Sequence, residues 1–100
     1  MVKLTVLYGQ PTSPDAFEKY YAETHLPLAA KMQGVRRIEL SKVTGAADGS
    51  PAAFYRLADL YFDDVAHMQR VMSTPEGKAT VADLSNFATG GVTTLVSNVS

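Results

Sequence analysis

The segment from Ala53 to Phe62 sets the tightest limit on the fold, because it has the length of a strand and is apolar on both faces. Alternation divides its side chains into two sets that point in opposite directions. One set contains Phe54, Ala58, Leu60 and Phe62, and the other contains Tyr55, Leu57, Asp59 and Tyr61. A strand that is apolar on both faces is covered on both faces. The chain must therefore provide or recruit two layers of cover for its sheet.

Three further segments, residues 2–8, 35–43 and 92–99, have strand patterns, and helical patterns separate them. The first helix is expected to begin after Ser13, a hydroxyl that precedes Pro14, and to kink near His25 because of Pro27. Residues 63–64 are expected to cap a second helix, and residues 74–77 to end it and start a third. The order is strand–helix–strand, twice. We therefore expect residues 1–100 to form one α+β domain of ferredoxin-like βαββαβ topology with a four-stranded antiparallel sheet.

Helices on one face of such a sheet leave the other face bare. Apolar side chains there, such as Leu57 and Tyr61, would then contact water. Burial of apolar surface stabilises by roughly 25 cal/mol per Å², and large exposed apolar patches are unusual on monomers. We expect a second copy to cover this face about a twofold axis, giving a homodimer. A ligand pocket would then lie within each subunit, between sheet and helices.

The composition excludes several classes of protein. Nine basic and ten acidic residues give a net charge of −1, so the sequence predicts no nucleic-acid partner. There is no cysteine, which excludes disulfides and thiolate catalysis. No apolar run approaches the roughly 20 residues that span a bilayer, and no signal peptide is visible. We expect no membrane partner and a cytoplasmic location.

Several short motifs together resemble the EthD family, which is named for a component of ethyl tert-butyl ether degradation. The resemblance covers nearly the whole chain, with the motifs in the same order. They are Phe17-x-x-Tyr20-Tyr21-x-x-Thr24-His25-Leu26-Pro27-Leu28, Gly34-Val35-Arg36-Arg37, Ala58-Asp59-Leu60-Tyr61-Phe62-Asp63-Asp64, Ser73-Thr74-Pro75-Glu76-Gly77 and Ala82-Asp83-Leu84-Ser85-Asn86-Phe87.

The resemblance implies a dimeric α+β barrel, whereas the biochemical role of the family is mostly undefined. Members are often labelled reductases, without a demonstrated cofactor. Related dimeric α+β barrels include cofactor-free monooxygenases, isomerases, polyketide cyclases and heme-degrading proteins, and in several a pocket histidine handles protons. Only His25, Tyr20 and Asp59 match well enough to carry over. Tyr20 stands where many relatives have tryptophan, which would change the size of the pocket.

His25 is the leading candidate for a catalytic residue. Its ordinary pKa of about 6.5 suits proton transfer near neutral pH, and its helical face predicts that it points toward the sheet. The alternative is a structural histidine that binds a carbonyl freed by the kink. Asp59 is the second catalytic candidate, because a buried acid must be paired, hydrogen-bonded or protonated. It would orient His25 or act as a base; the alternative is an ion pair with Arg37 or Arg56.

The aromatic residues are candidates for substrate binding. Tyr8, Tyr20, Tyr55 and Tyr61 would line a pocket and orient a ligand, or else would form amphipathic core. The second histidine, His67, lies off the apolar stripe of its helix and is expected on the surface.

The sequence predicts no cofactor and no metal. Two distant histidines without thiols have no recognised ligand spacing, and no dinucleotide-binding glycine motif follows a strand. Three functions follow as hypotheses. The first is a cofactor-free acid/base enzyme acting on a small hydrophobic organic compound, in its catabolism or oxidative processing. The second is a non-catalytic binding or accessory protein that supports an oxygenase system, and the third is a heme-binding protein that uses His25.

Overall fold

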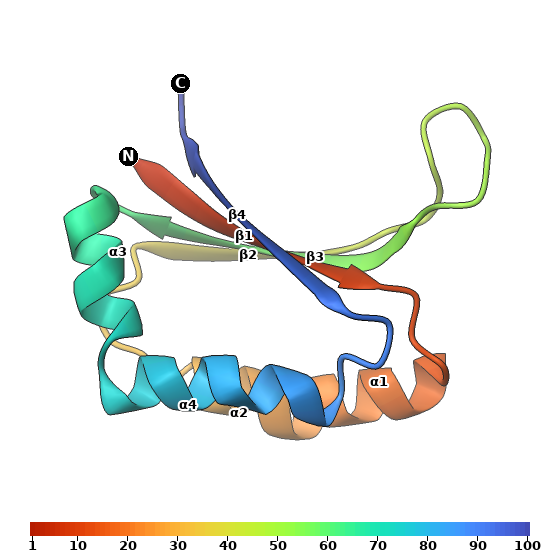
Figure 1. The fold of residues 1–100 in the computed structure, drawn as a ribbon, viewed down its shortest axis with the longest axis horizontal. Helices are drawn as coiled ribbons and strands as arrows, with labels where there is room; N and C mark the ends of the chain where they lie inside the picture. Colours follow the sequence, from red (N-terminus) through yellow and green to blue (C-terminus); the bar gives the residue numbers. More distant parts are fainter.

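The computed structural model describes all 100 residues of the chain and has the predicted ferredoxin-like α+β architecture. Four strands form one antiparallel sheet in the order β2-β3-β1-β4. Their bounds are β1 Val2–Gly9, β2 Arg37–Lys42, β3 Phe54–Phe62 and β4 Val92–Asn98. The helices lie on one face of the sheet, and the other face carries no helix (Figure 1). The predicted helix-free face is therefore present, and we call it the outer face.

Local capping sets where the helices begin. The Ser13 side chain accepts a hydrogen bond from the Ala16 amide at the start of α1 (Pro14–Tyr20), where proline supplies the first residue. The chain continues without a break through a π-helical turn, η1 (Tyr21–His25), into α2 (Leu26–Ala29). The predicted kink near His25 is therefore a change of helix type.

The second half of the chain follows the same rules. Asp64 caps α3 (Val65–Met72), and Thr74 caps α4 (Pro75–Asp83), each accepting a hydrogen bond from an amide of the first turn. The chain leaves α4 through a 3₁₀ turn, η2 (Leu84–Asn86). In Figure 1, α1, α2 and α4 form a layer opposite the sheet, and α3 stands at one end.

One prediction for β3 was wrong, and a β-bulge is the reason. Tyr8 of β1 pairs with Arg56, but the next residue, Gly9, pairs with Phe54, which leaves Tyr55 as an extra residue. The bulge turns Tyr55 to the helix side, where its ring lies 5.1 Å from that of Phe17. Simple alternation had placed Tyr55 on the outer face.

The core is divided unevenly between the two layers. At one end, aromatic rings from β1, α1, η1 and the segment after η2 form a close cluster of Tyr8, Phe17, Tyr21 and Phe87. Toward the other end, Phe62 of β3 and Val71 of α3 are buried between the sheet and α3. Between these two groups the side chains do not fill the space.

Candidate functional site

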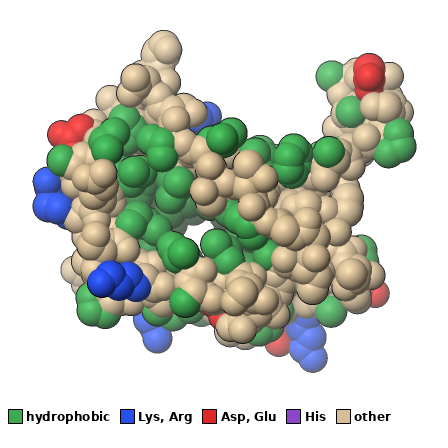
Figure 2. Space-filling view, in the orientation of Figure 1, with side chains coloured by type: hydrophobic (Ala, Val, Ile, Leu, Met, Phe, Trp, Pro, Cys, Tyr) green, Lys and Arg blue, Asp and Glu red, His purple; other side chains and the backbone are tan.

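A cavity of ≈ 470 Å³ occupies the space between the sheet and the helix layer. Its volume lies within the range of roughly 300–1,000 Å³ that is typical of small-molecule sites. Figure 2 shows the molecule hollowed here, with hydrophobic side chains around an opening that passes through it in this view. The sheet side of the cavity is almost wholly apolar, formed by Leu4, Val6, Ile38, Leu40, Ala58 and Leu60.

His25 reaches this cavity from the π-helical turn and is buried, with 4% of its surface exposed. The turn has a local cause. Pro27 has no amide hydrogen, and its ring would clash with the carbonyl four residues earlier in a regular α-helix. The chain widens just before it, so that the Leu26 amide donates to the Tyr21 carbonyl five residues back. The sequence around Pro27 thus places the imidazole ring at the wall of the cavity between the helices and the sheet.

Asp83, at the end of α4, holds the ring in place. Its Oδ2 lies 2.9 Å from His25 Nδ1, and both side chains are buried. Its Oδ1 accepts hydrogen bonds from the Tyr20 hydroxyl at 2.6 Å and from Asn86 Nδ2 at 2.9 Å. The His25 ring also packs on Phe87, with centroids 4.6 Å apart. Three donors therefore converge on one carboxylate, and together they fix the position of the histidine.

The charge state of Asp83 follows from these contacts. Burial pushes the pKa of its carboxyl upward, but hydrogen bonds from Tyr20, Asn86 and His25 outweigh burial, so that the pKa is lowered. An ionised carboxylate only accepts hydrogen bonds. Nδ1 of His25 must then be the protonated nitrogen of the neutral ring, and Nε2 is left with a lone pair.

His25 Nε2 has no hydrogen-bond partner in the protein, yet it is not shielded from the cavity. The Tyr21 hydroxyl is the only side-chain polar atom that is both fully enclosed and without a hydrogen-bond partner. His25 Nε2 also lacks a partner but is not fully enclosed, and its ring lines the cavity, so Nε2 is accessible to a molecule in the cavity. A histidine whose Nδ1–H is held by a carboxylate, and whose Nε2 faces a ligand space, is equipped to take and return a proton.

The predicted tyrosines separate into different environments. Tyr8 lines the cavity. Tyr20 does not line the cavity; its hydroxyl donates a hydrogen bond to Asp83, and its ring stacks on Phe87. Tyr55 lies buried against Phe17, outside the cavity wall. Tyr61 is on the outer face, where the guanidinium of Arg37 lies 5.2 Å from its ring centre.

The prediction that Asp59 orients His25 was wrong, because the two residues lie on opposite faces of the sheet. Asp59 is on the outer face and accepts a 2.5 Å hydrogen bond from the hydroxyl of Thr5, its cross-strand neighbour on β1. The alternative ion pairs are absent too. Arg56 binds Glu18 through two hydrogen bonds, and Arg37 binds Glu39.

The expectation that His67 is a surface residue was also wrong. It is 8% exposed, its ring packs edge-on against Phe62, and its Nδ1 accepts a hydrogen bond from the Asp63 amide. This histidine ties the end of β3 to α3 and does not line the cavity. Its neutral ring carries the proton on Nε2, the opposite tautomer to His25.

Sequence reasoning missed Asp83 and Asn86 as part of the site. Asp83 stands in the last turn of α4. A carboxylate is unfavourable there, because the C-terminal end of the helix dipole is also negative. An acid in that unfavourable position was the available signal. Tyr21 was missed as well, although it adjoins the predicted Tyr20.

The structure has no group of three or more His, Cys, Asp or Glu side chains placed to hold a metal ion. None of its helices has the length and apolar character required to cross a bilayer.

Comparison with known proteins places the chain in a family. A sequence model described as the EthD domain matches residues 9–91. An uncharacterized 11.0 kDa protein from the thcB-thcC intergenic region of Rhodococcus erythropolis is 39% identical over 95 residues, covering 95% of this chain and 91% of the relative. The crystal structure of an EthD family protein from Bacillus halodurans superposes with a TM-score of 0.93 at 36% identity, covering 100% of this chain and 99% of the other.

A more distant likeness concerns the fold alone. SnoaB of Streptomyces nogalater, described as a cofactor-independent oxygenase, superposes with a TM-score of 0.66 at 16% identity, covering 98% of this chain and 91% of that protein. The match over residues 9–91, the 39% identity and the near-complete superposition agree with one another. This chain belongs to the EthD family.

Proposed function

We propose that this protein is a cofactor-free acid/base enzyme that acts on a small hydrophobic organic compound, in its catabolism or oxidative processing. The observation that carries the proposal is the orientation of His25, whose Nδ1 is held by buried Asp83 while Nε2 is accessible from an apolar cavity. In this role Nε2 removes a proton from the bound molecule, and the resulting imidazolium is stabilised by the carboxylate. The same group then returns a proton to the product.

The apolar wall increases the effect of this pair. Electrostatic interactions are stronger in a site that excludes water, so the attraction between Asp83 and a protonated His25 stabilises the charge that develops during proton transfer. General acid–base catalysis of this kind contributes typically about 10²–10⁴-fold to a rate. The fold of SnoaB supports the idea that such a framework can house chemistry without a cofactor.

We also propose that the working form is a homodimer joined through the outer face. Leu95 in the middle of β4 is 51% exposed there, next to Thr5 of β1 in the register. Leu7 and Leu57 pair on the same face. A second copy placed on this surface would remove these side chains from water and would leave the cavity, on the helix side, unobstructed.

Proton exchange tests the acid/base role without knowledge of the natural substrate. Methyl nonyl ketone or acetophenone is incubated with the protein in D₂O, and the loss of the protons next to the carbonyl is followed by NMR. We expect exchange above the buffer rate, reduced about 10²-fold or more by His25→Ala. The Tyr61→Phe variant, changed on the outer face, is the control and should retain full exchange.

A non-catalytic binding protein that supports an oxygenase is the alternative. It predicts that the ketones raise the melting temperature of the wild type and of His25→Ala equally, with no exchange above buffer in either. That pattern would refute the catalytic proposal.

A further inference from the structure

The cavity wall offers a ligand few hydrogen-bonding groups. The polar side chains that line it are Tyr8, Tyr21, His25, Thr80 and Thr94. The Tyr21 hydroxyl is fully enclosed and cannot reach a ligand, and the Thr80 hydroxyl already donates to the carbonyl of residue 76. Thr94 is exposed on β4, at the edge of the sheet, where it contacts water. Tyr8 and His25 are therefore the buried groups that remain for a ligand.

The Tyr8 side chain is buried, but its hydroxyl is open to the cavity. The residue lines the cavity and is 2% exposed, and its oxygen has no hydrogen-bond partner in the protein. This oxygen is not fully enclosed, since the Tyr21 hydroxyl is the only unpaired side-chain polar atom that is. Buried hydroxyls nearly always have a partner. The Tyr8 hydroxyl is thus a donor that faces ligand space without an acceptor.

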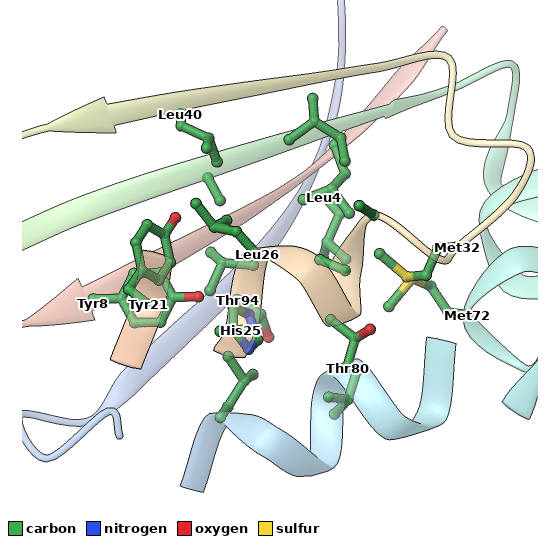
Figure 3. A pocket seen from close by; sticks show the side chains of 18 of the residues that line it. Leu4, Tyr8, Tyr21, His25, Leu26, Met32, Leu40, Met72, Thr80 and Thr94 are labelled. Atoms are coloured by element: carbon green, nitrogen blue, oxygen red, sulfur yellow. The ribbon is translucent and has the colours of Figure 1, made fainter. Parts of the chain in front are cut away.

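Two aromatic rings hold Tyr8 and His25 next to each other. The ring centre of Phe87 lies 5.6 Å from that of Tyr8 and 4.6 Å from that of His25. The ring centre of Tyr21 lies 5.7 Å and 5.9 Å from the same two rings. In Figure 3, Tyr8 and His25 lie at one end of the cavity, and Met32 and Met72 lie at the other. A ligand with a polar group at the first end therefore meets a donor and an acceptor together.

The protonation state of Tyr8 makes it a donor and not a second base. Burial raises the pKa of its hydroxyl, and the neighbouring Tyr21 and Asp83 raise it further. The phenol therefore keeps its proton near neutral pH. His25 Nε2, in contrast, carries a lone pair because Asp83 holds the ring proton on Nδ1. The two groups have opposite hydrogen-bonding characters.

The charge of the wall limits the class of ligand. No Asp, Glu, Lys or Arg side chain lines the cavity. A charged ligand would lose its hydration here without a partner of opposite charge on the wall, which opposes its binding. A carbonyl oxygen is neutral and only accepts hydrogen bonds, so it suits the Tyr8 hydroxyl. The carbon next to a carbonyl is also a position from which a base can remove a proton.

We propose that the cavity takes a neutral carbonyl compound whose oxygen accepts a hydrogen bond from Tyr8, with the carbon next to the carbonyl facing His25 Nε2. The proposal rests on the proposed function, since it assigns a substrate class and a second substrate-binding group to the same site. The rest of the molecule lies along the apolar wall, toward Met32 and Met72.

The proton transfer balances within this arrangement. Nε2 takes the proton from the carbon, and the electron pair of the broken C–H bond forms a carbon–carbon double bond. The π pair of the carbonyl moves onto its oxygen, and the hydrogen bond from Tyr8 strengthens as negative charge develops there. The pair of Asp83 and protonated His25 has no net charge at that moment. On return, Nε2 gives the proton back to the carbon and the carbonyl re-forms.

A ketone labelled with ¹³C at its carbonyl tests the hydrogen bond without requiring turnover. Methyl nonyl ketone and undecane, which have equal chain lengths, are titrated against wild type, Tyr8→Phe, His25→Ala and Tyr61→Phe. A hydrogen bond withdraws electron density from the carbonyl carbon and moves its NMR signal to higher frequency. We expect this displacement in wild type and in His25→Ala, and its loss in Tyr8→Phe. Tyr8→Phe should also weaken the ketone about 2–10-fold and leave undecane unchanged.

Two further measurements separate a ligand-binding hydroxyl from a structural one. The melting temperature of ligand-free Tyr8→Phe should equal that of wild type, because the hydroxyl has no hydrogen bond to lose. Proton exchange with the ketone in D₂O should fall about 10²-fold, the usual effect of removing a donor to a developing oxyanion. Tyr61→Phe, changed on the outer face, is the matched control and should behave as wild type throughout.

The outcomes separate this proposal from the acid/base role of His25. A carbonyl signal that depends on Tyr8, without any exchange in wild type, supports the binding mode and refutes catalysis. Exchange in wild type, combined with an identical carbonyl signal and identical affinity in Tyr8→Phe, overturns the binding mode and leaves catalysis standing. A wild type that does not bind the ketone, or binds it no more tightly than undecane, also overturns the binding mode.

Discussion

Replacing Asp83 by asparagine isolates the charge that holds His25. The amide oxygen can still accept from the Tyr20 hydroxyl and from Asn86, which both bind Oδ1 in the structure. The amide nitrogen then takes the place of Oδ2, 2.9 Å from His25 Nδ1, where two N–H groups would face each other. One hydrogen bond to a charged acceptor is lost, and such bonds contribute about 1.5–3 kcal/mol. The histidine can recover part of this by moving its proton to Nε2.

We therefore expect Asp83→Asn to lower the free energy of unfolding by about 2 kcal/mol, measured by urea unfolding near neutral pH with an unchanged m-value. In a domain of this size that loss corresponds to a fall in melting temperature of roughly 8–16 °C. Proton exchange with a ketone should fall by about 10² or more, because a proton on Nε2 removes the base from the cavity.

Asp63→Asn is the control, since Asp63 also forms a two-hydrogen-bond ion pair, with Arg36, but on the surface. Exposed pairs contribute about 0–1 kcal/mol, so this variant should change the stability by less than half as much. Equal losses for the two variants would show that the buried pair does not hold His25 in the way that the geometry indicates.

Three other predictions concern packing, pH and assembly. Gly77→Ala should cost about 1–3 kcal/mol in urea unfolding, because an added Cβ would lie 2.5 Å from a backbone oxygen of α3, whereas Gly45→Ala, with nothing within 4 Å, should be neutral. Because the pKa of Asp83 is lowered in the folded protein, its carboxylate stabilises the fold fully at pH values above its ordinary pKa near 3.8, and this stabilisation is lost as the pH falls through the lower pKa of the folded protein. The difference in melting temperature between wild type and Asp83→Asn should therefore be constant above about pH 5 and shrink below about pH 4. Leu95→Arg, on the outer face, should produce monomers in sedimentation, whereas Val65→Arg, an equally drastic change on exposed α3, should not; a wild type that is monomeric at micromolar concentration would refute the dimer.

The fold was accessible from the sequence because its signals are local and agree with one another. Alternation marked the strands, and Ser13, Asp64 and Thr74 marked helix starts through side-chain caps that the structure contains. Pro27 predicted a disturbance at His25, although only the structure shows that it is a π-helical turn. Such features depend on residues a few positions apart.

The composition of the site was less accessible, because it depends on residues far apart in sequence. Asp83 lies 58 positions from His25 in the sequence, and the spacing of the two residues does not predict their contact. Asp59 was chosen in its place because it is an acid on an apolar strand, but alternation could not say which face the helices cover. The structure answers this by placing Val6 and Ala58 on the cavity side and Thr5 and Asp59 on the outer face.

The tyrosines illustrate a second limit. Tyr55 was assigned to a face by counting residues in steps of two, and a single extra residue at the bulge reverses that count. Tyr20 and Tyr21 are adjacent in the sequence, yet Tyr20 donates a hydrogen bond to Asp83 and Tyr21 lines the cavity. Composition identified the residue type, and only the packing distinguishes the roles.

The central claim is that His25 presents an unprotonated Nε2 to the cavity, and the tautomer of the ring tests it most directly. Long-range ¹H–¹⁵N correlation spectra near neutral pH distinguish a neutral ring protonated on Nδ1 from one protonated on Nε2. We predict the Nδ1–H form for His25 and, within the same spectrum, the Nε2–H form for His67, whose Nδ1 accepts the Asp63 amide. An Nε2–H tautomer at His25 would contradict the proposed base, whatever ligand the cavity binds.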